Sequence, residues 1–280
     1  MTTSGRGAAV VTGAAGGLGR ALAAALHADG WRVLLTDVDA DAVGAVAGPL
    51  GGWSRPLDVR DGAACAAVAA EAAGGPGGLG LWVNNAGILV TGPAWEQDAE
   101  TRQRVIEVNA LGAVNGTLAA VAVMREQGHG HVLNVVSLAG LIAAPGETVY
   151  AASKHALLAF SLGTLTDLRM AGVRGVHVSC LCPDGIWTPM LHDRLDDPGA
   201  LASFTGSLLT AERVAARAVR LARRPRPVVS LPRWRGAQVR LLDAFPRLAL
   251  ALTPVVRAAG RAGQRRQARR VRADARRPRL

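Results

Sequence analysis

The chain contains one tyrosine and one lysine, Tyr150 and Lys154, and the two lie four residues apart. The other basic residues are all arginines, so this position favours a compact ammonium group over a planar guanidinium. On a helix, residues i and i+4 share a face, which places the phenol and the ammonium at one site. A neighbouring cation lowers the pKa of a phenol, so the pair predicts a tyrosine that exchanges protons near neutral pH. The alternative is a half-buried tyrosine beside a lysine whose ammonium reaches solvent.

A second candidate site is the glycine-rich segment 12–19, Thr-Gly-Ala-Ala-Gly-Gly-Leu-Gly. Glycines allow a tight turn and let a pyrophosphate approach the N–H groups at a helix N-terminus, where the helix dipole is positive. Asp37 lies 18 residues beyond Gly19, at the end of an apolar run. A carboxylate there accepts hydrogen bonds from both adenosine ribose hydroxyls and repels a 2′-phosphate, and positions 36–41 contain no arginine to bind one. We therefore expect a dinucleotide without a 2′-phosphate; the alternative is a solvated Asp37 at a strand end.

These residues need a scaffold of strands and helices to bring them together. Short apolar runs predict strands at 8–11, 31–36, 53–57, 81–83, 131–136, 176–181 and 228–231. Helical spacing predicts helices at 20–29, 63–73, 100–127 and 149–171. This alternation indicates an α/β fold, a doubly wound parallel sheet with helices on both faces. We expect one such domain over 1–231, with a mobile segment at 187–210 and an extension over 232–280.

Six ordered motifs resemble the short-chain dehydrogenase/reductase family. They are T-G-x-x-x-G-x-G at 12–19, Asn-Asn-Ala-Gly at 84–87, Asn109 in Val-Asn-Ala, Ser137 after a strand, the Tyr150/Lys154 pair, and a segment at 183–190 similar to P-G-x-V-x-T-x-M. The resemblance covers residues 6–231. It implies a Rossmann-type fold and hydride transfer between a nicotinamide cofactor and an alcohol or ketone.

The resemblance also implies a role for each matching residue. Tyr150 would exchange a proton with the substrate oxygen, and Ser137 would hydrogen-bond the same oxygen. Lys154 would hold the nicotinamide ribose and tune Tyr150, while Asn109 would bind a water through its helix backbone and link Lys154 to solvent. The residues expected along the cofactor are Gly13, Gly17, Leu18, Gly19, Asp37, Asp58, Val59, Asn85, Ala86, Gly87, Tyr150, Lys154, Pro183, Ile186 and Thr188. The expected cofactor is NAD rather than NADP.

Asp184 departs from the family pattern, which has a glycine after the proline. One interpretation is a backbone substitute, since aspartate tolerates unusual dihedral angles. The other is an additional carboxylate that favours the cationic oxidised nicotinamide over the reduced form.

Composition restricts the class of protein. Cys65, Cys180 and Cys182 make no disulfide framework, and the six histidines show no metal-ligand spacing. The first residues contain no apolar signal-peptide region, and no apolar stretch long enough to span a bilayer is free of charge. We expect a cytoplasmic protein, and the family resemblance implies a homo-oligomer, either a dimer or a tetramer.

The sequence indicates the role of two segments least clearly: the expected substrate segment, 187–210, and the C-terminal extension, 232–280. Apolar residues between 187 and 208 favour a lipophilic alcohol or ketone: Trp187, Met190, Leu191, Leu195, Leu201, Phe204 and Leu208. Residues 211–280 carry 20 arginines against Glu212, Asp243 and Asp274, whereas the remainder of the chain is net acidic. Leu241, Leu242, Phe245, Leu248 and Leu252 recur at helical spacing, with Pro246 and Pro254 as breaks.

The extension has three possible roles: a helix that packs on a partner and ends in a disordered charged tail, a peripheral anchor on anionic membrane, or a nucleic-acid contact. The third is disfavoured because no aromatic residues interleave the terminal arginines. Two functions therefore remain: a dehydrogenase, or a non-catalytic Rossmann-type binding protein that acts through its basic extension on anionic membrane or nucleic acid.

Overall fold

The computed structural model describes residues 6–206 and 208–275. Its centre is a seven-stranded sheet in the order β3-β2-β1-β4-β5-β6-β7, in which every neighbouring pair is parallel. The strands are β1 (Ala8–Thr12), β2 (Arg32–Asp37), β3 (Ser54–Pro56), β4 (Leu79–Asn84), β5 (Gly130–Val135), β6 (Val176–Pro183) and β7 (Val228–Leu231). The predicted parallel sheet is confirmed.

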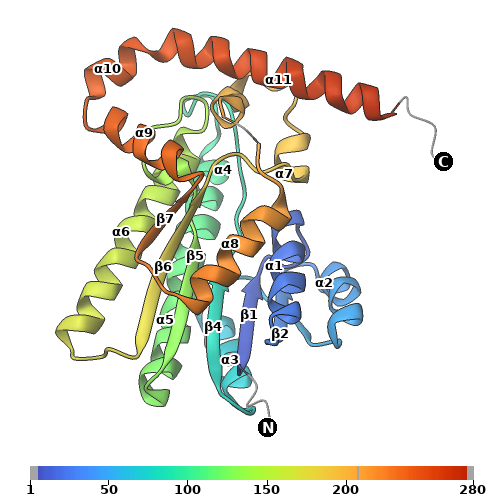
Figure 1. The fold of residues 1–280 in the computed structure, drawn as a ribbon, viewed down its shortest axis with the longest axis vertical. Helices are drawn as coiled ribbons and strands as arrows, with labels where there is room; N and C mark the ends of the chain where they lie inside the picture. The colour runs from blue at the N-terminus through green and yellow to red at the C-terminus, as the bar shows by residue number, and fades with distance from the viewer. Residues whose placement is uncertain (1–5, 207, 276–280) are drawn as a thin grey trace.

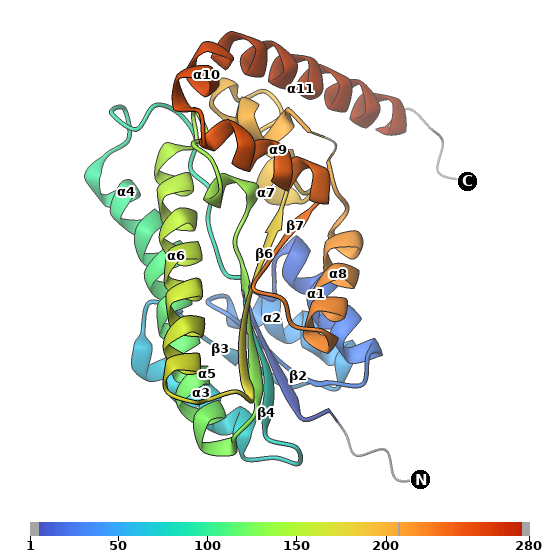
Figure 2. The same ribbon diagram turned by 60° about the vertical axis from the view of Figure 1, so that its left-hand side comes forward.

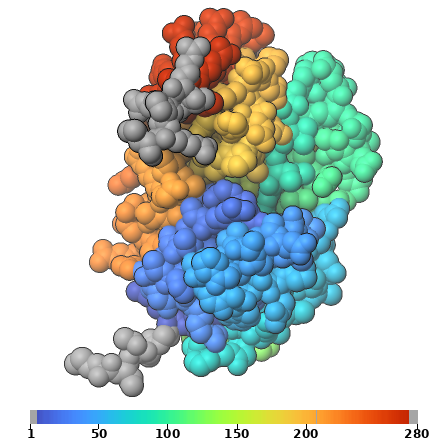
Figure 3. All heavy atoms as spheres, turned by 90° about the vertical axis from the view of Figure 1, so that its right-hand side faces the viewer, coloured from blue at the N-terminus to red at the C-terminus, as the bar shows by residue number. Residues whose placement is uncertain are grey.

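Helices cover both faces of the sheet (Figures 1 and 2). One face carries α1 (Gly17–Ala28), α2 (Ala40–Ala47) and α8 (Ala211–Arg223). The other carries α3 (Gly62–Ala73), α5 (Gly112–Gln127) and α6 (Thr148–Met170), with α4 (Ala99–Ile106) beside α6. In Figure 3, α1 and α2 fill the lower part of the face toward the viewer, and the C-terminal helices lie above them.

The two-residue period of β1 explains why residues 8–11 are all apolar. Ala9 and Val11 of β1 pack into the core under α1 and α8, whereas Ala8 and Val10 pack into the core under α3 and α5. All four side chains are fully buried. A strand buried on both faces has no position for a charged residue.

Two helices and one interruption were missing from the sequence-based prediction. No helix was predicted at α2 or α8, and the helix predicted at 100–127 is divided by a π-helical turn, η2 (Glu107–Leu111).

Residues 99–127 are long and apolar enough to cross a membrane by composition, with a mean hydropathy of 1.4. Half of the apolar 18-residue stretch within these residues is buried inside the protein, which is typical of a core helix.

The segment 187–210 is better ordered than predicted. It forms α7 (Pro189–His192) and the 3₁₀ helix η4 (Pro198–Phe204), and a short 3₁₀ turn, η3 (Leu138–Gly140), lies after β5. Leu191, Ala200 and Phe204 form a small buried cluster, which gives the segment an apolar core of its own.

The C-terminal extension forms three helices that arch over the end of the sheet farthest from the N-terminus (Figures 1 and 2). They are α9 (Arg233–Asp243), α10 (Pro246–Ala251) and α11 (Thr253–Ala275). Pro246 lies in the first turn of α10, as expected of a residue that starts a helix but cannot continue one. The charged end was expected to be disordered, but it is helical to Ala275; residues 276–280 lie outside the described residues.

Candidate active site

A cavity of about 1210 Å³ lies at the carboxyl ends of the strands. It is lined by residues that follow β1, β2, β4, β5 and β6, and by residues of the C-terminal extension. The order of strands reverses between β1 and β4, and ligands bind at such a switch point in open α/β sheets.

One end of the cavity is a cradle of glycines. Gly13 has a positive φ of 65°, and a Cβ there would lie 2.7 Å from the Cα of Ala86. A Cβ on Gly17 would lie 3.0 Å from the Thr188 side chain, and one on Gly19 would overlap the carbonyl oxygen of Gly13. Gly16 caps α1 without a side-chain hydrogen bond, and the first turn contains no acidic residue. The N-terminus of α1 therefore offers its N–H groups to an anion, which fits a pyrophosphate.

Asp37 lies beside this cradle at the end of β2. Its Oδ2 accepts a hydrogen bond of 3.0 Å from the Ala15 N–H, and its Oδ1 accepts one of 3.3 Å from Asp39. These bonds tie the carboxylate to the glycine-rich turn while it still lines the cavity. Such a position suits recognition of ribose hydroxyls.

Asn85 and Asp58 bring the next two loops to the same end of the cavity. The Asn85 side chain donates to the carbonyl oxygens of Thr12 and Gly13, each at 3.0 Å, and so joins the loop after β4 to the loop after β1. Asp58 forms an ion pair with Arg60, at 2.6 Å, and hydrogen bonds from Arg60 hold the pKa of Asp58 below its ordinary value.

The predicted catalytic side chains meet at the other end of the cavity. Tyr150 and Lys154 lie one turn apart on α6, with the ammonium nitrogen 5.7 Å from the centre of the phenol ring. Lys154 is buried, and its Nζ donates a 3.0 Å hydrogen bond to the carbonyl oxygen of Val135 on β5. Ser137 follows that strand, and its hydroxyl lies near the phenol of Tyr150, where a hydrogen bond between them would favour the phenolate.

The protonation of this pair differs from the sequence-based expectation. Burial raises the pKa of Tyr150 above its ordinary value, the charge of Glu147 raises it further, and the bond with Ser137 lowers it. Burial also lowers the pKa of Lys154 to about 8. The predicted lowering of the tyrosine pKa by the ammonium is therefore wrong, because desolvation disfavours the charged forms of both side chains.

Asn109 lies in the π-helical turn η2 and is fully buried. Its Nδ2 donates to the carbonyl oxygen of Ile88 at 2.8 Å and to Ser153 Oγ at 3.1 Å, and its Oδ1 accepts from the Ile88 N–H at 2.7 Å. The side chain thus joins the loop after β4 to α6, the helix that carries Tyr150 and Lys154. A role for its backbone in binding water stays a prediction.

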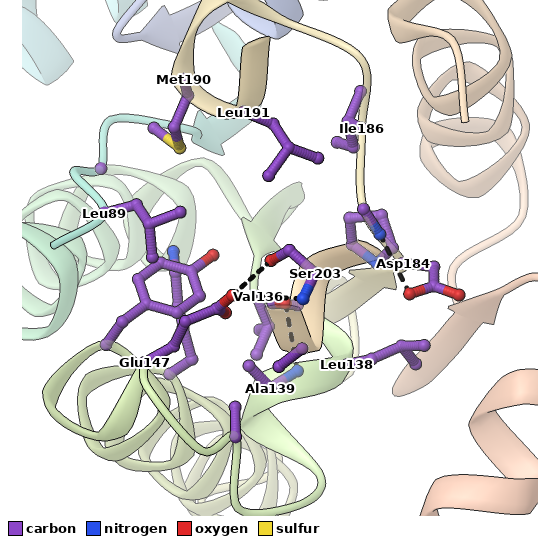
Figure 4. A pocket seen from close by; sticks show the side chains of 18 of the residues that line it. Leu89, Val136, Leu138, Ala139, Glu147, Asp184, Ile186, Met190, Leu191 and Ser203 are labelled. Carbon is purple, nitrogen blue, oxygen red and sulfur yellow. Dashed lines mark hydrogen bonds between the residues drawn. The ribbon is translucent and has the colours of Figure 1, made fainter. Parts of the chain in front are cut away.

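Glu147 is a residue of the site that the sequence-based analysis missed. It lies one turn before Tyr150, is almost fully buried and lines the cavity. Its Oε1 accepts hydrogen bonds from the Ser203 hydroxyl at 2.7 Å and from the Ser203 N–H at 3.2 Å, and Figure 4 shows the two side chains facing each other. Burial raises the pKa of Glu147 to about 7, despite these bonds. No spacing rule connects the two residues, so the sequence contained no signal for the pair.

Asp184 forms an ion pair with the C-terminal extension that the sequence did not indicate. Its Oδ2 accepts a 3.1 Å bond from the Nε of Arg235 on α9, and both side chains are largely buried. Arg235 also donates to Thr205 Oγ1 at 3.0 Å and to Gln238 Oε1 at 2.8 Å. No non-glycine residue among 6–206 and 208–275 has a positive φ, so Asp184 does not occupy the left-handed region that favours glycine. Both interpretations of Asp184, as a backbone substitute and as a carboxylate that favours the oxidised nicotinamide, stay predictions.

The extension provides the cover of the cavity. Arg235, Gln238, Val239, Leu242 and later residues as far as Ala259 line it, opposite the apolar residues Leu89, Leu138, Met190 and Leu191. Sequence spacing predicted helices here but not the place where they dock.

The structure brings the predicted site residues together with one exception. The following line the cavity: Gly13, Gly17, Leu18, Gly19, Asp37, Asp58, Val59, Asn85, Ala86, Gly87, Ser137, Tyr150, Lys154, Pro183, Ile186 and Thr188. Asn109 lies behind them and contacts the site through Ile88 and Ser153.

Comparison with known proteins agrees with this geometry. A family model described as short chain dehydrogenase matches residues 7–199. A 2-dehydro-3-deoxy-L-rhamnonate dehydrogenase (NAD(+)) from Sphingomonas sp. (strain SKA58) is 36% identical over 185 residues, 65% of this chain and 73% of that protein. A 1-deoxy-11-beta-hydroxypentalenate dehydrogenase from Streptomyces exfoliatus is 37% identical over 201 residues, 69% of this chain and 72% of that protein. The crystal structure of a short chain dehydrogenase/reductase from Burkholderia phymatum in complex with NAD superimposes with a TM-score of 0.78 and 29% identity, covering 89% of this chain and 97% of that one.

Proposed function

The chain belongs to the short-chain dehydrogenase family of oxidoreductases, and on that premise we propose that it transfers a hydride between NAD(H) and a lipophilic secondary alcohol or ketone, with Tyr150 as acid and base. The observation that carries the proposal is one cavity with the glycine cradle at one end and Tyr150, Ser137 and Lys154 at the other.

The side chains at the second end suit the proton half of such a reaction. A nicotinamide cofactor, when bound, accepts or supplies the hydride. When an alcohol is oxidised, its carbinol carbon loses a hydride and its hydroxyl group must lose a proton. In ketone reduction the protonated Tyr150 gives its proton to the substrate oxygen, and in alcohol oxidation the phenolate takes that proton back; Ser137 holds the same oxygen, and a hydrogen bond from its hydroxyl would stabilise the phenolate. Lys154 is fixed on Val135 beside the phenol and orients the cofactor ribose.

NAD rather than NADP is supported by Asp37. Its carboxylate lines the cavity beside the cradle, where it repels a 2′-phosphate. The Sphingomonas relative is named as an NAD(+) enzyme, and the Burkholderia structure contains NAD. A lipophilic substrate is supported by the apolar lining from Leu89, Leu138, Met190 and Leu242.

The experiment that tests this proposal is the Tyr150→Phe variant, assayed with a panel of secondary alcohols and NAD⁺. We expect kcat to fall by about 10² to 10⁴, the usual contribution of a general acid or base. NADH titration by tryptophan fluorescence is the control, because the variant should bind NADH as the parent does and both should bind NADPH more weakly.

Two outcomes would contradict the proposal. A kcat of Tyr150→Phe equal to that of the parent would show that Tyr150 is not the acid and base of the reaction. A folded parent protein that binds neither NADH nor NADPH would favour the alternative function, a non-catalytic binding protein that acts through its basic extension.

A further inference from the structure

The outer side of the extension carries apolar side chains that the domain leaves uncovered. We call them the apolar rim: Leu241, Phe245, Leu248, Leu250 and Val255, each more than half exposed. They fall on α9, α10 and the beginning of α11, with Phe245 in the turn between α9 and α10, and lie within fifteen consecutive residues of the sequence. Aliphatic and aromatic side chains gathered in this way mark a surface that contacts another apolar phase.

The apolar rim is continuous with the cavity of the proposed active site. Leu250 and Val255 line that cavity although they are 73% and 62% exposed. Residues of the same helices, Leu242 and Val256, line it from inside. The apolar rim therefore reaches the edge of the cavity at Leu250 and Val255.

The next helix presents a row of positive charges. Arg257, Arg261, Arg265 and Arg269 follow one another at four-residue spacing along α11 and are exposed. The opposite side of α11 packs on η4 through Gly260 and Gly263, where a Cβ would overlap the carbonyl oxygens of Leu201 and Phe204. The row, which we call the arginine face, is thus turned outward on a fixed helix.

Gln264 adds a specific attachment on the packed side of α11. Its side chain is buried and donates to the carbonyl oxygen of Asp197 at 2.7 Å and to that of Arg194 at 3.3 Å. Because α11 is attached to the domain, the arginine face keeps a constant position relative to the apolar rim.

We propose that α9, α10 and α11 dock on an anionic lipid bilayer, with the apolar rim at the acyl boundary and the arginine face on the headgroup phosphates. A bilayer offers both an apolar phase and negative charge, which is what interfacial helices of this composition bind. Nucleic acid would match only the arginines and would leave the apolar rim in water. The docking itself does not depend on the proposed function. Only one consequence rests on it, namely that a lipophilic substrate would enter the cavity from the bilayer.

The test is flotation of the full chain with vesicles of phosphatidylcholine alone and of phosphatidylcholine with phosphatidylglycerol. We expect binding to the anionic vesicles only, weakened by salt. Arg261, Arg265 and Arg269, all changed to Gln, should weaken partition roughly a hundredfold, since each arginine near an anionic surface contributes about a factor of five. The matched control changes Arg125, Arg169 and Arg174 to Gln; these exposed arginines lie on α5, α6 and the loop after α6, and the change should leave partition unaltered.

The apolar rim is tested by Phe245→Asp combined with Leu248→Asp, two positions that do not line the cavity. This variant should lose partition although the arginine face is intact, whereas Met170→Asp, at an exposed position at the end of α6, should not.

Three results would overturn the docking proposal: no binding to anionic vesicles, equal losses in the two arginine variants, or a rim variant that binds as the parent does. A dimer in gel filtration that Phe245→Asp with Leu248→Asp dissolves would instead assign the apolar rim to a second copy of the chain. Flotation does not involve turnover, so its failure is distinct from a failure of the Tyr150→Phe test.

Discussion

At the scale of residues, the site contains side chains that sequence motifs predicted and one side chain, Glu147, that only the folded structure identified. Tyr150, Lys154 and Ser137 were predicted from spacing and from a family pattern, and the structure places them together. Glu147 was not predicted, because an isolated glutamate does not show that Ser203 of η4, 56 residues away, will cover it. The shift in the pKa of Tyr150 was predicted in the wrong direction for the same reason. The spacing of a tyrosine and a lysine in the sequence does not show how deeply the two side chains are buried.

The first prediction concerns Glu147 and the pH dependence of stability. Its pKa is raised from 4.5 to about 7 in the folded protein, so the folded state holds the proton more tightly than the unfolded state. Its contribution to stability is complete below pH 4.5 and is lost as the pH rises through 7. Glu147→Gln keeps an acceptor for Ser203 and removes this loss. We expect it to exceed the parent by up to about 3 kcal/mol in unfolding free energy at pH 9.

Urea denaturation at pH 5 and pH 9 measures this difference. At pH 5 the gap between Glu147→Gln and the parent should be small, because the parent carboxyl is then mostly protonated. Glu126→Gln, at an exposed position on α5, is the matched control and should show no pH-dependent gap. A gap of equal size at the two pH values would contradict a raised carboxyl pKa.

At the scale of elements, a buried ion pair attaches the extension to the sheet. Asp184 directly follows β6 and lines the cavity, and Arg235 belongs to α9, so their bond attaches α9 to the carboxyl end of β6. The second prediction is that Asp184→Asn costs about 3 to 5 kcal/mol, because it leaves a charged guanidinium without its partner. The double variant with Arg235→Gln should recover part of that loss.

A double-mutant cycle in urea isolates this coupling. The exposed pair Arg55 and Glu71 is the comparison, with side chains 51% and 33% exposed, and its coupling should stay within about 1 kcal/mol. Equal coupling energies for the two pairs would show that the bond between Asp184 and Arg235 does not attach α9.

The elements also show how far local patterns reach. Charge-free runs such as 8–11 predicted their strands to within a residue or two, because a strand buried on both faces admits only apolar side chains. Helix α9 was predicted from apolar spacing, but the spacing did not show that Leu242 would line the cavity while Leu241 stayed exposed. That division depends on where the helix docks, which Arg235 decides through a partner 51 residues away.

At the scale of the whole molecule, the two ends of the cavity belong to different parts of the chain. The end with the glycine cradle is built around Gly13, Asp37 and Asn85 in the first half, where we propose that the cofactor binds, and residues of α9, α10 and α11 line the proposed substrate end. Displacing the last helices should therefore change the binding of a lipophilic substrate and leave the binding of NADH unchanged.

The third prediction uses Gly260 and Gly263 to test this separation. A glycine-to-alanine change inside a helix normally stabilises it by about 1 kcal/mol. Gly44→Ala with Gly163→Ala should behave in this way, since nothing lies within 4 Å of a Cβ at either position. Gly260→Ala with Gly263→Ala should instead lift α11, because each methyl group would overlap a backbone carbonyl of η4.

Trypsin should then cleave the arginine face faster, and KM for a lipophilic alcohol should rise while the Kd for NADH stays constant. Unchanged cleavage would mean that α11 is not held by this contact, and a weakened Kd for NADH would mean that the two ends of the cavity are not independent.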